Sequence, residues 1–344
     1  MQERHETGQH PDGTALAWHH LADASMGSTA QVAVSVGANC LSWQVPFQGE
    51  MLELLWSDLA TLVSYPARHG MPILFPFPNR IRAGRYSWQG RDYHLPCNDP
   101  RGANAIHGFI LHRPWQVVEA SETTDTGSFV RLALASSSLP PEVQQQWPAA
   151  FDVEVAWLLH GTTLELQVDV RNCGEEALPL GFGVHPYFRM PAAGAALQWR
   201  GEPAVRQWEL RDCLPTGTLG PVTPRCHKLL TGQPLGEDSL DDAFRIDGKA
   251  GQGAWLLRSP EGWSIRATQG PNCTAFRDYV IFRPPHREAV CLEPYTCITD
   301  AINLHQQGID AGLLVLSPGE TWEGWLRWEW LDPATTQQAL EEPT

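Results

Sequence analysis

Apolar and polar residues alternate most regularly between positions 151 and 172. The apolar positions are Phe151, Val153, Val155 and Trp157 before the dipeptide His160-Gly161, and Leu164, Leu166, Val168 and Val170 after it. A period of two on both sides of a turn is typical of two antiparallel strands that bury one face. The segment therefore predicts a β-hairpin.

Shorter stretches repeat this pattern along the chain. Strands are expected at residues 31–36, 40–45, 86–88, 93–95, 129–135, 254–258, 263–267 and 321–331. Only one short helix is expected, at residues 141–146. The 30 glycines and 28 prolines are spread throughout, which favours short strands and frequent turns over long helices. The pattern predicts one all-β domain over residues 26–333, with a flexible tail at 1–25 and a second tail at 334–344.

The charge balance narrows the classes of partner. The chain has 344 residues and a net charge of −15, from 24 basic and 39 acidic residues. A nucleic-acid-binding protein needs a basic surface to neutralise phosphates, so nucleic acid is not expected as a partner. No apolar run approaches the roughly 18 residues of a membrane span, so no membrane partner is expected either. A neutral small molecule fits this composition better.

The eight cysteines are scattered, and no two form a C-x-x-C pair. In a chain of this length, that pattern indicates reduced thiols and neither a disulfide framework nor a zinc site. The N-terminal sequence MQERHETGQHPDGT has no hydrophobic core of a secretory signal. Together these features predict a cytoplasmic protein.

Four segments place polar residues where a β-fold would otherwise have apolar ones. They are PILFPFPNRIRAGR at 72–85, AIHG at 105–108, GFGVHPYFRM at 181–190 and CLEPYT at 291–296. Pro186 biases His185 toward an extended backbone, and Gly181 and Gly183 allow another chain or a ligand to approach closely. Glu293 follows an apolar run, where desolvation would raise its pKa toward the value that suits a general base. Each segment alone also has a structural explanation, such as a packed histidine or an ion pair.

In this order, and together with LDDAF at 240–244, these four segments resemble the aldose 1-epimerase (mutarotase) family. The matching motifs are P-N-R-I at 78–81, I-H-G at 106–108, H-P-Y-F at 185–188, D-D-A-F at 241–244 and L-E-P at 292–294. The similarity extends over roughly residues 30–332 and includes the central hairpin. The resemblance implies a large antiparallel β-sandwich whose open concave face holds a free aldohexose.

The resemblance also implies roles for individual residues. His185 would protonate the ring oxygen as general acid, and Glu293 would remove the proton of the anomeric hydroxyl as general base, from opposite sides of the sugar. Arg80, His107 and Asp241 would position the sugar, with His107 assisting at the ring oxygen. Asn79 is an additional expected contact, and the adjacent Asp242 remains an alternative to Asp241.

The reaction moves only protons, so no cofactor and no metal are expected. The sequence agrees, because it has no G-x-G-x-x-G after a strand and no P-loop. The expected assembly is a monomer or a weak homodimer.

Three alternatives remain open at this point. Arg80, Arg82 and Arg85 could bind a phosphate, as in a hexose-6-phosphate 1-epimerase, since arginine binds phosphate in bidentate fashion. Asp241 and Glu293 could be the carboxylate pair of a glycosidase, although His185 would then have no role. A non-catalytic sugar-binding protein would need none of the acid–base groups. Arg189 departs from the small polar residue that many family members carry after H-P-Y-F.

Overall fold

The computed structural model describes residues 6–9, 15–190, 194–201, 205–246, 254–269, 276–286 and 288–341. Antiparallel strands dominate these residues, and three large sheets form two layers. The prediction of an all-β sandwich is confirmed.

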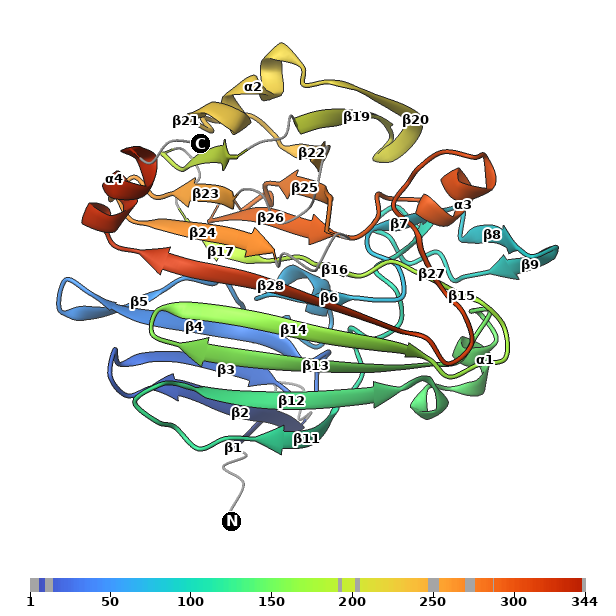
Figure 1. Cartoon of the computed structure of the whole chain (residues 1–344), viewed down its shortest axis with the longest axis horizontal. Helices are drawn as coiled ribbons and strands as arrows, with labels where there is room; N and C mark the ends of the chain where they lie inside the picture. The colour runs from blue at the N-terminus through green and yellow to red at the C-terminus, as the bar shows by residue number, and fades with distance from the viewer. Residues whose placement is uncertain are drawn as a thin grey trace.

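One layer is a nine-stranded sheet whose long strands cross the middle of the molecule (Figure 1). In sheet order its strands are β11 (Gln116–Ala120), β12 (Ser128–Ala135), β13 (Phe151–His160), β14 (Thr163–Asn172), β28 (Thr321–Leu331), β24 (Ser264–Gln269), β23 (Ala254–Arg258), β18 (Ala196–Arg200) and β21 (Gly232–Pro234). Strands β13 and β14 pair from Phe151↔Asn172 to His160↔Thr163, which confirms the predicted hairpin.

The other layer contains a five-stranded and an eight-stranded sheet. The first has the order β1 (Glu6–Gln9), β2 (Ala15–Asp23), β3 (Ser28–Ala33), β4 (Asn39–Phe47) and β5 (Glu50–Glu53). The second has the order β20 (Leu214–Pro221), β19 (Val205–Arg211), β22 (Asp241–Ile246), β25 (Asp278–Phe282), β26 (Ala289–Tyr295), β16 (Gly183–Val184) and β6 (Ile73–Leu74), with β17 (Tyr187–Arg189) also paired to β26. This eight-stranded sheet and its links carry His185, Asp241 and Glu293.

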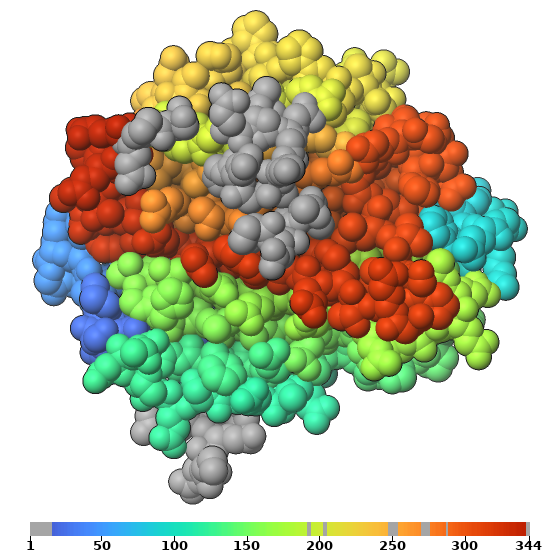
Figure 2. Space-filling view, in the orientation of Figure 1, coloured from blue at the N-terminus to red at the C-terminus, as the bar shows by residue number. Residues whose placement is uncertain are grey.

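Short elements complete the fold. The two-stranded pairs are β7 (Arg80–Arg82) with β10 (Asn104–Ile106), β8 (Arg85–Trp88) with β9 (Arg91–His94), and β15 (Leu178–Leu180) with β27 (Leu314–Leu316). The helices are α1 (Pro141–Gln144), α2 (Pro224–Thr231), α3 (Ala301–Gln306) and α4 (Pro333–Glu341), with 3₁₀ turns at Pro66–Arg68 and Ser136–Ser138. In the space-filling view, α2, β19 and β20 form one end of the molecule (Figure 2).

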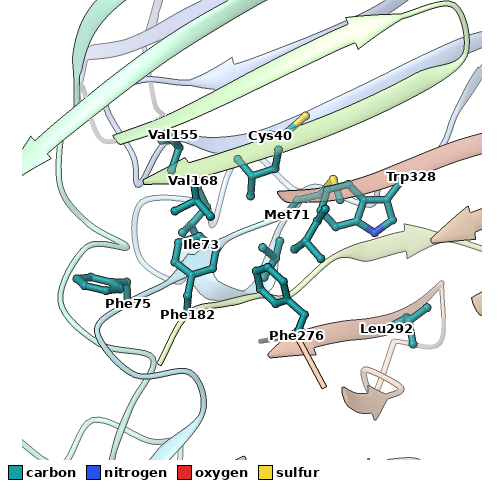
Figure 3. Close-up of a cluster of buried hydrophobic side chains, with 14 of the residues drawn as sticks. Cys40, Met71, Ile73, Phe75, Val155, Val168, Phe182, Phe276, Leu292 and Trp328 are labelled. Carbon is teal, nitrogen blue, oxygen red and sulfur yellow. The ribbon is translucent and has the colours of Figure 1, made fainter. Parts of the chain in front are cut away.

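The main hydrophobic core lies between the two layers. Figure 3 shows Val155, Val168 and Trp328 of the nine-stranded sheet in one cluster with side chains of the other layer, including Ile73 and Leu292. The indole of Trp157 adds a polar link, because its Nε1 donates to the carbonyl of Ala38 at 2.8 Å. This contact satisfies a buried donor and connects the layers.

Both predicted tails contain regular structure. Strand β2 lies within residues 1–25 and pairs with β3, and α4 lies within residues 334–344 apart from its first residue. The sequence ALAWHHLAD of β2 lacks strict alternation because it places two histidines in its centre. In α4 only Thr336 is buried, so no apolar stripe marks the helix.

Candidate functional site

The register of the eight-stranded sheet places His185 opposite Glu293. On either side of this position, Gly183 pairs with Tyr295 and Tyr187 pairs with Cys291. His185 lies in the link between β16 and β17, where Pro186 interrupts the ladder because it has no N–H to donate. The Nε2 atom of His185 is 3.5 Å from Oε1 of Glu293, and the two residues are 6 % and 1 % exposed. An imidazole and a carboxylate from segments about a hundred residues apart are thus in direct contact.

The same register separates Asp241 from Asp242. Residues two apart on a strand, and direct partners on neighbouring strands, point to the same face of a sheet. Asp241 pairs with Phe282, and Phe282 pairs with Cys291, which is two residues before Glu293. Asp241 therefore shares the face of Glu293 and is accessible to solvent there.

Asp242 points to the opposite face, the one that carries Leu292 into the main core. Its carboxylate forms an ion pair with Arg225 of α2 and accepts from Gln207 Nε2 at 3.2 Å. Of the two adjacent acids, only Asp241 lies on the face of the His185–Glu293 pair.

Strands β7 and β10 bring Asn79, Arg80 and His107 to this face. Arg80 pairs with Ile106 in the ladder, and the next residue, His107, donates its backbone N–H to the carbonyl of Asn79 at 2.9 Å. Asn79 and His107 both have positive φ, 55° and 66°, in the left-handed region that is uncommon for residues other than glycine. The ring of His107 is inclined to that of His185 by 64°, at a centroid distance of 5.6 Å.

The Arg80 side chain is held from two directions. Its NH1 donates to Oδ1 of Asn79 at 2.9 Å, and its Nε lies 3.6 Å from Oδ2 of Asp99. Asp99 in turn accepts from the side chain of Asn104 at 2.9 Å. These contacts fix a mostly buried guanidinium beside the histidines.

The other arginines noted in the sequence lie in different surroundings. Arg82 Nε lies 3.3 Å from Asp300 Oδ2, and Arg85 is exposed. Arg189 directs its Nε toward the carbonyl of Leu55 at 3.3 Å. Arg82 is therefore already neutralised by a carboxylate.

Aromatic side chains enclose His185. The ring of Tyr187 stacks on it at a centroid distance of 4.7 Å, and Phe282 approaches edge-on at 5.9 Å. Burial lowers the pKa of His185 to about 3, and the charge of Arg80 acts in the same direction. Burial also lowers the pKa of His107 well below its usual value.

Burial has the opposite sign for the carboxyl group. It raises the pKa of Glu293 well above its usual value, and the negative charge of Asp241 adds to this rise. Desolvation penalises the charged form of each group, so burial favours a neutral imidazole and a carboxylic acid. This pair holds one transferable proton, and moving it from Glu293 to His185 yields an imidazolium and a carboxylate without exchange with solvent.

Two ring nitrogens at the site lack protein partners. Among the described residues, Nδ1 of His107 and Nδ1 of His185 are buried and have no hydrogen-bond partner. Buried polar atoms are usually satisfied, and a catalytic role is one explanation for an exception. All six residues singled out by sequence (Asn79, Arg80, His107, His185, Asp241 and Glu293) come from the strands and links around this one region.

Several residues that contact the site were not predicted from sequence. Asp99 holds Arg80, Phe282 packs on His185, and the hydroxyl of Tyr295 donates to Glu293. Tyr187 lies inside the motif H-P-Y-F, and Tyr295 directly follows the motif L-E-P, so their closeness to the site was available from sequence. Asp99 and Phe282 carried no such signal.

Two further findings concern the described residues as a set. The seven cysteines among them are free thiols, and Cys273 lies outside the described ranges. Within those ranges no helix is long and apolar enough to cross a membrane.

Comparison with known proteins identifies the family. The family model for aldose 1-epimerase matches residues 22–329. The uncharacterized protein YihR of Escherichia coli is 35 % identical over 255 residues, which cover 74 % of this chain and 77 % of YihR. Mouse galactose mutarotase is 26 % identical over 167 residues, 47 % of this chain and 46 % of the mouse protein.

Solved structures share the fold. A galactose mutarotase-like protein from Clostridium acetobutylicum superposes with a TM-score of 0.80 at 20 % identity, over 95 % of this chain and 98 % of that one. The family model extends over most of the sequence and includes every residue of the candidate site. The chain belongs to the aldose 1-epimerase family.

Proposed function

We propose that the protein interconverts the α and β anomers of a free aldohexose, an isomerase reaction. The observation that carries the proposal is the contact of 3.5 Å between His185 Nε2 and Glu293 Oε1 on one face of the eight-stranded sheet. The anomeric oxygen O1 and the ring oxygen O5 of a pyranose are bonded to the same carbon, C1. Two adjacent acid–base groups can therefore serve both oxygens at once.

In the proposed reaction, Glu293 removes the proton of the O1 hydroxyl as a carboxylate. The electron pair of that O–H bond forms the carbonyl at C1, the C1–O5 bond breaks, and O5 takes a proton from the His185 imidazolium. Rotation about C1–C2 presents the other face of the aldehyde, and the reverse transfers close the ring. Each general acid or base contributes typically about 10²–10⁴-fold to the rate.

This arrangement changes one expectation from sequence. The acid and the base were expected on opposite sides of the sugar, whereas their side chains lie next to each other. We therefore propose that the C1–O5 edge of the sugar points at the pair. Arg80, His107, Asp241 and Asn79 are proposed to bind its hydroxyls, and His107 to assist at O5.

A free sugar is favoured over a 6-phosphorylated one. A phosphate would need uncommitted cations, but Arg82 is paired with Asp300 and Arg80 lies near Asp99. The remaining member of the cluster, Arg85, is exposed.

The test is polarimetry of freshly dissolved α-D-glucose and α-D-galactose with the wild-type protein and with Glu293→Gln. The substitution is expected to lower the catalysed rate by at least about 10²-fold, because an amide cannot accept the proton. Glu165→Gln is a matched control, since Glu165 is also buried but pairs with Arg327 on the nine-stranded sheet. Full activity of Glu293→Gln would refute the assignment of the base. Faster turnover of 6-phosphorylated sugars, or release of the leaving group from aryl glycosides, would favour the alternative reactions.

A further inference from the structure

The hydroxyl of Tyr295 donates a hydrogen bond to Oε2 of Glu293. Tyr295 follows Glu293 by two positions on β26, so both side chains point to the same face. The other carboxylate oxygen, Oε1, is the one that lies 3.5 Å from His185 Nε2. The two oxygens of the carboxylate thus have different partners, a phenol on one side and the imidazole on the other.

Gly183 provides the space for the ring of Tyr295. The two residues are direct partners across the β16–β26 ladder. A Cβ atom at Gly183 would lie 2.4 Å from Cδ1 and 2.8 Å from Cε1 of the tyrosine ring, and 2.8 Å from Cβ of Pro78. These distances are shorter than Cβ atoms approach other atoms in proteins, and the tyrosine ring is the nearest obstacle. A glycine paired with an aromatic residue allows the ring to lie over its backbone. The second glycine of the GFG sequence, Gly183, is therefore matched to a particular ring.

The ring is held in place by its surroundings. Tyr295 is fully buried and packs in a cluster with Leu74, Val280 and Cys297. The side chain of Asn79 interacts with the same hydroxyl. A phenol restrained in this way has little freedom to release the carboxylate.

We propose that Tyr295 is a positioning residue: by occupying Oε2 of Glu293 it reserves Oε1 for the anomeric hydroxyl, and Gly183 is required because it admits the ring. The inference rests on the proposed function, in which Glu293 is the base. Without the phenol, the carboxyl could rotate and either oxygen could face His185.

The hydrogen bond also acts on the protonation of the base. A donor to the carboxylate stabilises its charged form and lowers the pKa of Glu293, against the rise caused by burial. The titratable and charged groups around Glu293 are His185, Asp241, Arg80, Tyr295, Tyr187 and Cys291. Of these, Tyr295 is the group whose hydroxyl donates to the carboxylate.

The experiment compares Tyr295→Phe with the wild-type protein by two readouts. The first is the titration of the Glu293 carboxyl in the free protein, followed by ¹³C NMR of carboxyl-labelled glutamate and assigned with Glu293→Gln. The second is the pH profile of kcat/KM for mutarotation. We expect the Glu293 titration to move to higher pH, and with it the alkaline limb of the profile, because this titration removes the one transferable proton of the pair. We also expect kcat/KM at neutral pH to fall about 10- to 100-fold, as for loss of a hydrogen bond to a charged group.

Tyr279→Phe is the matched control. Tyr279 is a buried tyrosine of the neighbouring strand β25 that points to the opposite face, where its hydroxyl donates to Gln269. Its substitution removes a buried hydroxyl and is expected to leave both readouts unchanged. Gly183→Ala is the second variant, expected to displace the ring and shift the titration in the same direction. The double variant Gly183→Ala with Tyr295→Phe should shift the titration by less than the sum of the two single shifts, because both substitutions act on one contact.

An unchanged Glu293 titration in folded Tyr295→Phe overturns the inference, and so does an equal shift in Tyr279→Phe. The NMR readout does not depend on turnover. If the wild-type protein fails to accelerate mutarotation, the proposed function fails, while the Tyr295–Glu293 coupling is still tested by the titration.

Discussion

The ion pair of Arg245 and Asp278 is buried on the same sheet face as the candidate site. Arg245 binds both carboxylate oxygens, with NH2–Oδ2 at 2.6 Å and Nε–Oδ1 at 3.0 Å, and Trp208 Nε1 donates to Oδ1 at 2.8 Å. The two charged side chains are 4 % and 0 % exposed. Asp278 is also the direct ladder partner of Tyr295. The pair therefore supports the strand that carries Glu293.

Removing one partner should be far more destabilising than removing both. Burial raises the pKa of Asp278 even with Arg245 beside it, so the attraction does not fully offset the cost of desolvation. Asp278→Asn leaves the buried guanidinium with only the exposed carboxylate of Asp310, 3.6 Å from its NH1, as a counter-charge. Loss of the buried partner costs about 3–5 kcal/mol of unfolding free energy. Replacing both residues, as in Arg245→Met with Asp278→Leu, removes that charge as well. The double variant still leaves the Nε1–H of Trp208 without its acceptor, which costs about 1–3 kcal/mol of unfolding free energy.

Urea denaturation followed by far-ultraviolet circular dichroism and tryptophan fluorescence measures these free energies. We expect Asp278→Asn to be the least stable of the three proteins and the double variant to lie between it and the wild type. A double variant as unstable as Asp278→Asn, or less stable, would refute the reasoning, because it would mean that the ion pair itself supplies the stability.

Two further predictions concern the acids of the site. Asp241→Asn should weaken sugar binding, measured as a higher KM at an unchanged Tm. Asp242→Asn should instead lower the Tm, because it releases Arg225, and should leave KM unchanged. The reverse pattern would contradict the assignment of the two acids to opposite faces of the sheet. Glu293→Gln should be more stable than the wild type at pH 8 and equally stable near pH 4. The pKa of Glu293 is raised in the folded state, so as the pH rises above the unfolded value of about 4.5 the unfolded chain ionises first and the wild type loses stability. Each unit by which the pKa is raised corresponds to about 1.4 kcal/mol of unfolding free energy, which urea denaturation measures at the two pH values. If the variant and the wild type are equally stable at both pH values, burial does not perturb the carboxyl group.

The regular strands were the most predictable part of the fold. The bounds of β23 and β28 agree with the predicted 254–258 and 321–331, and the hairpin of β13 and β14 was found over its full length. In these segments, apolar and polar residues alternate in the sequence, and their side chains alternate between the buried and the more exposed face of the sheet. Helices α2 and α3 were missed because each is short and buries only two or three side chains, which is too few to produce a helical period.

The site was predictable as a set of residues but not as a geometry. Short motifs identified His185 and Glu293, yet their contact depends on the register of β16, β17 and β26, which join distant parts of the chain. The choice between Asp241 and Asp242 likewise needed the ladders that link β22 to β26. Asp99 was missed because its loop sequence gives no indication of the arginine that it approaches.

The alternation along β26 has a consequence for how such a protein can change. Leu292 enters the main core and Glu293 points to the other face. Insertion or deletion of a single residue within this strand would exchange the two, putting a carboxylate in the apolar interior and a leucine beside the imidazole. Folding and chemistry are thereby subject to the same constraint, so divergence among descendants of this chain should accumulate in the connecting loops, with strand length preserved.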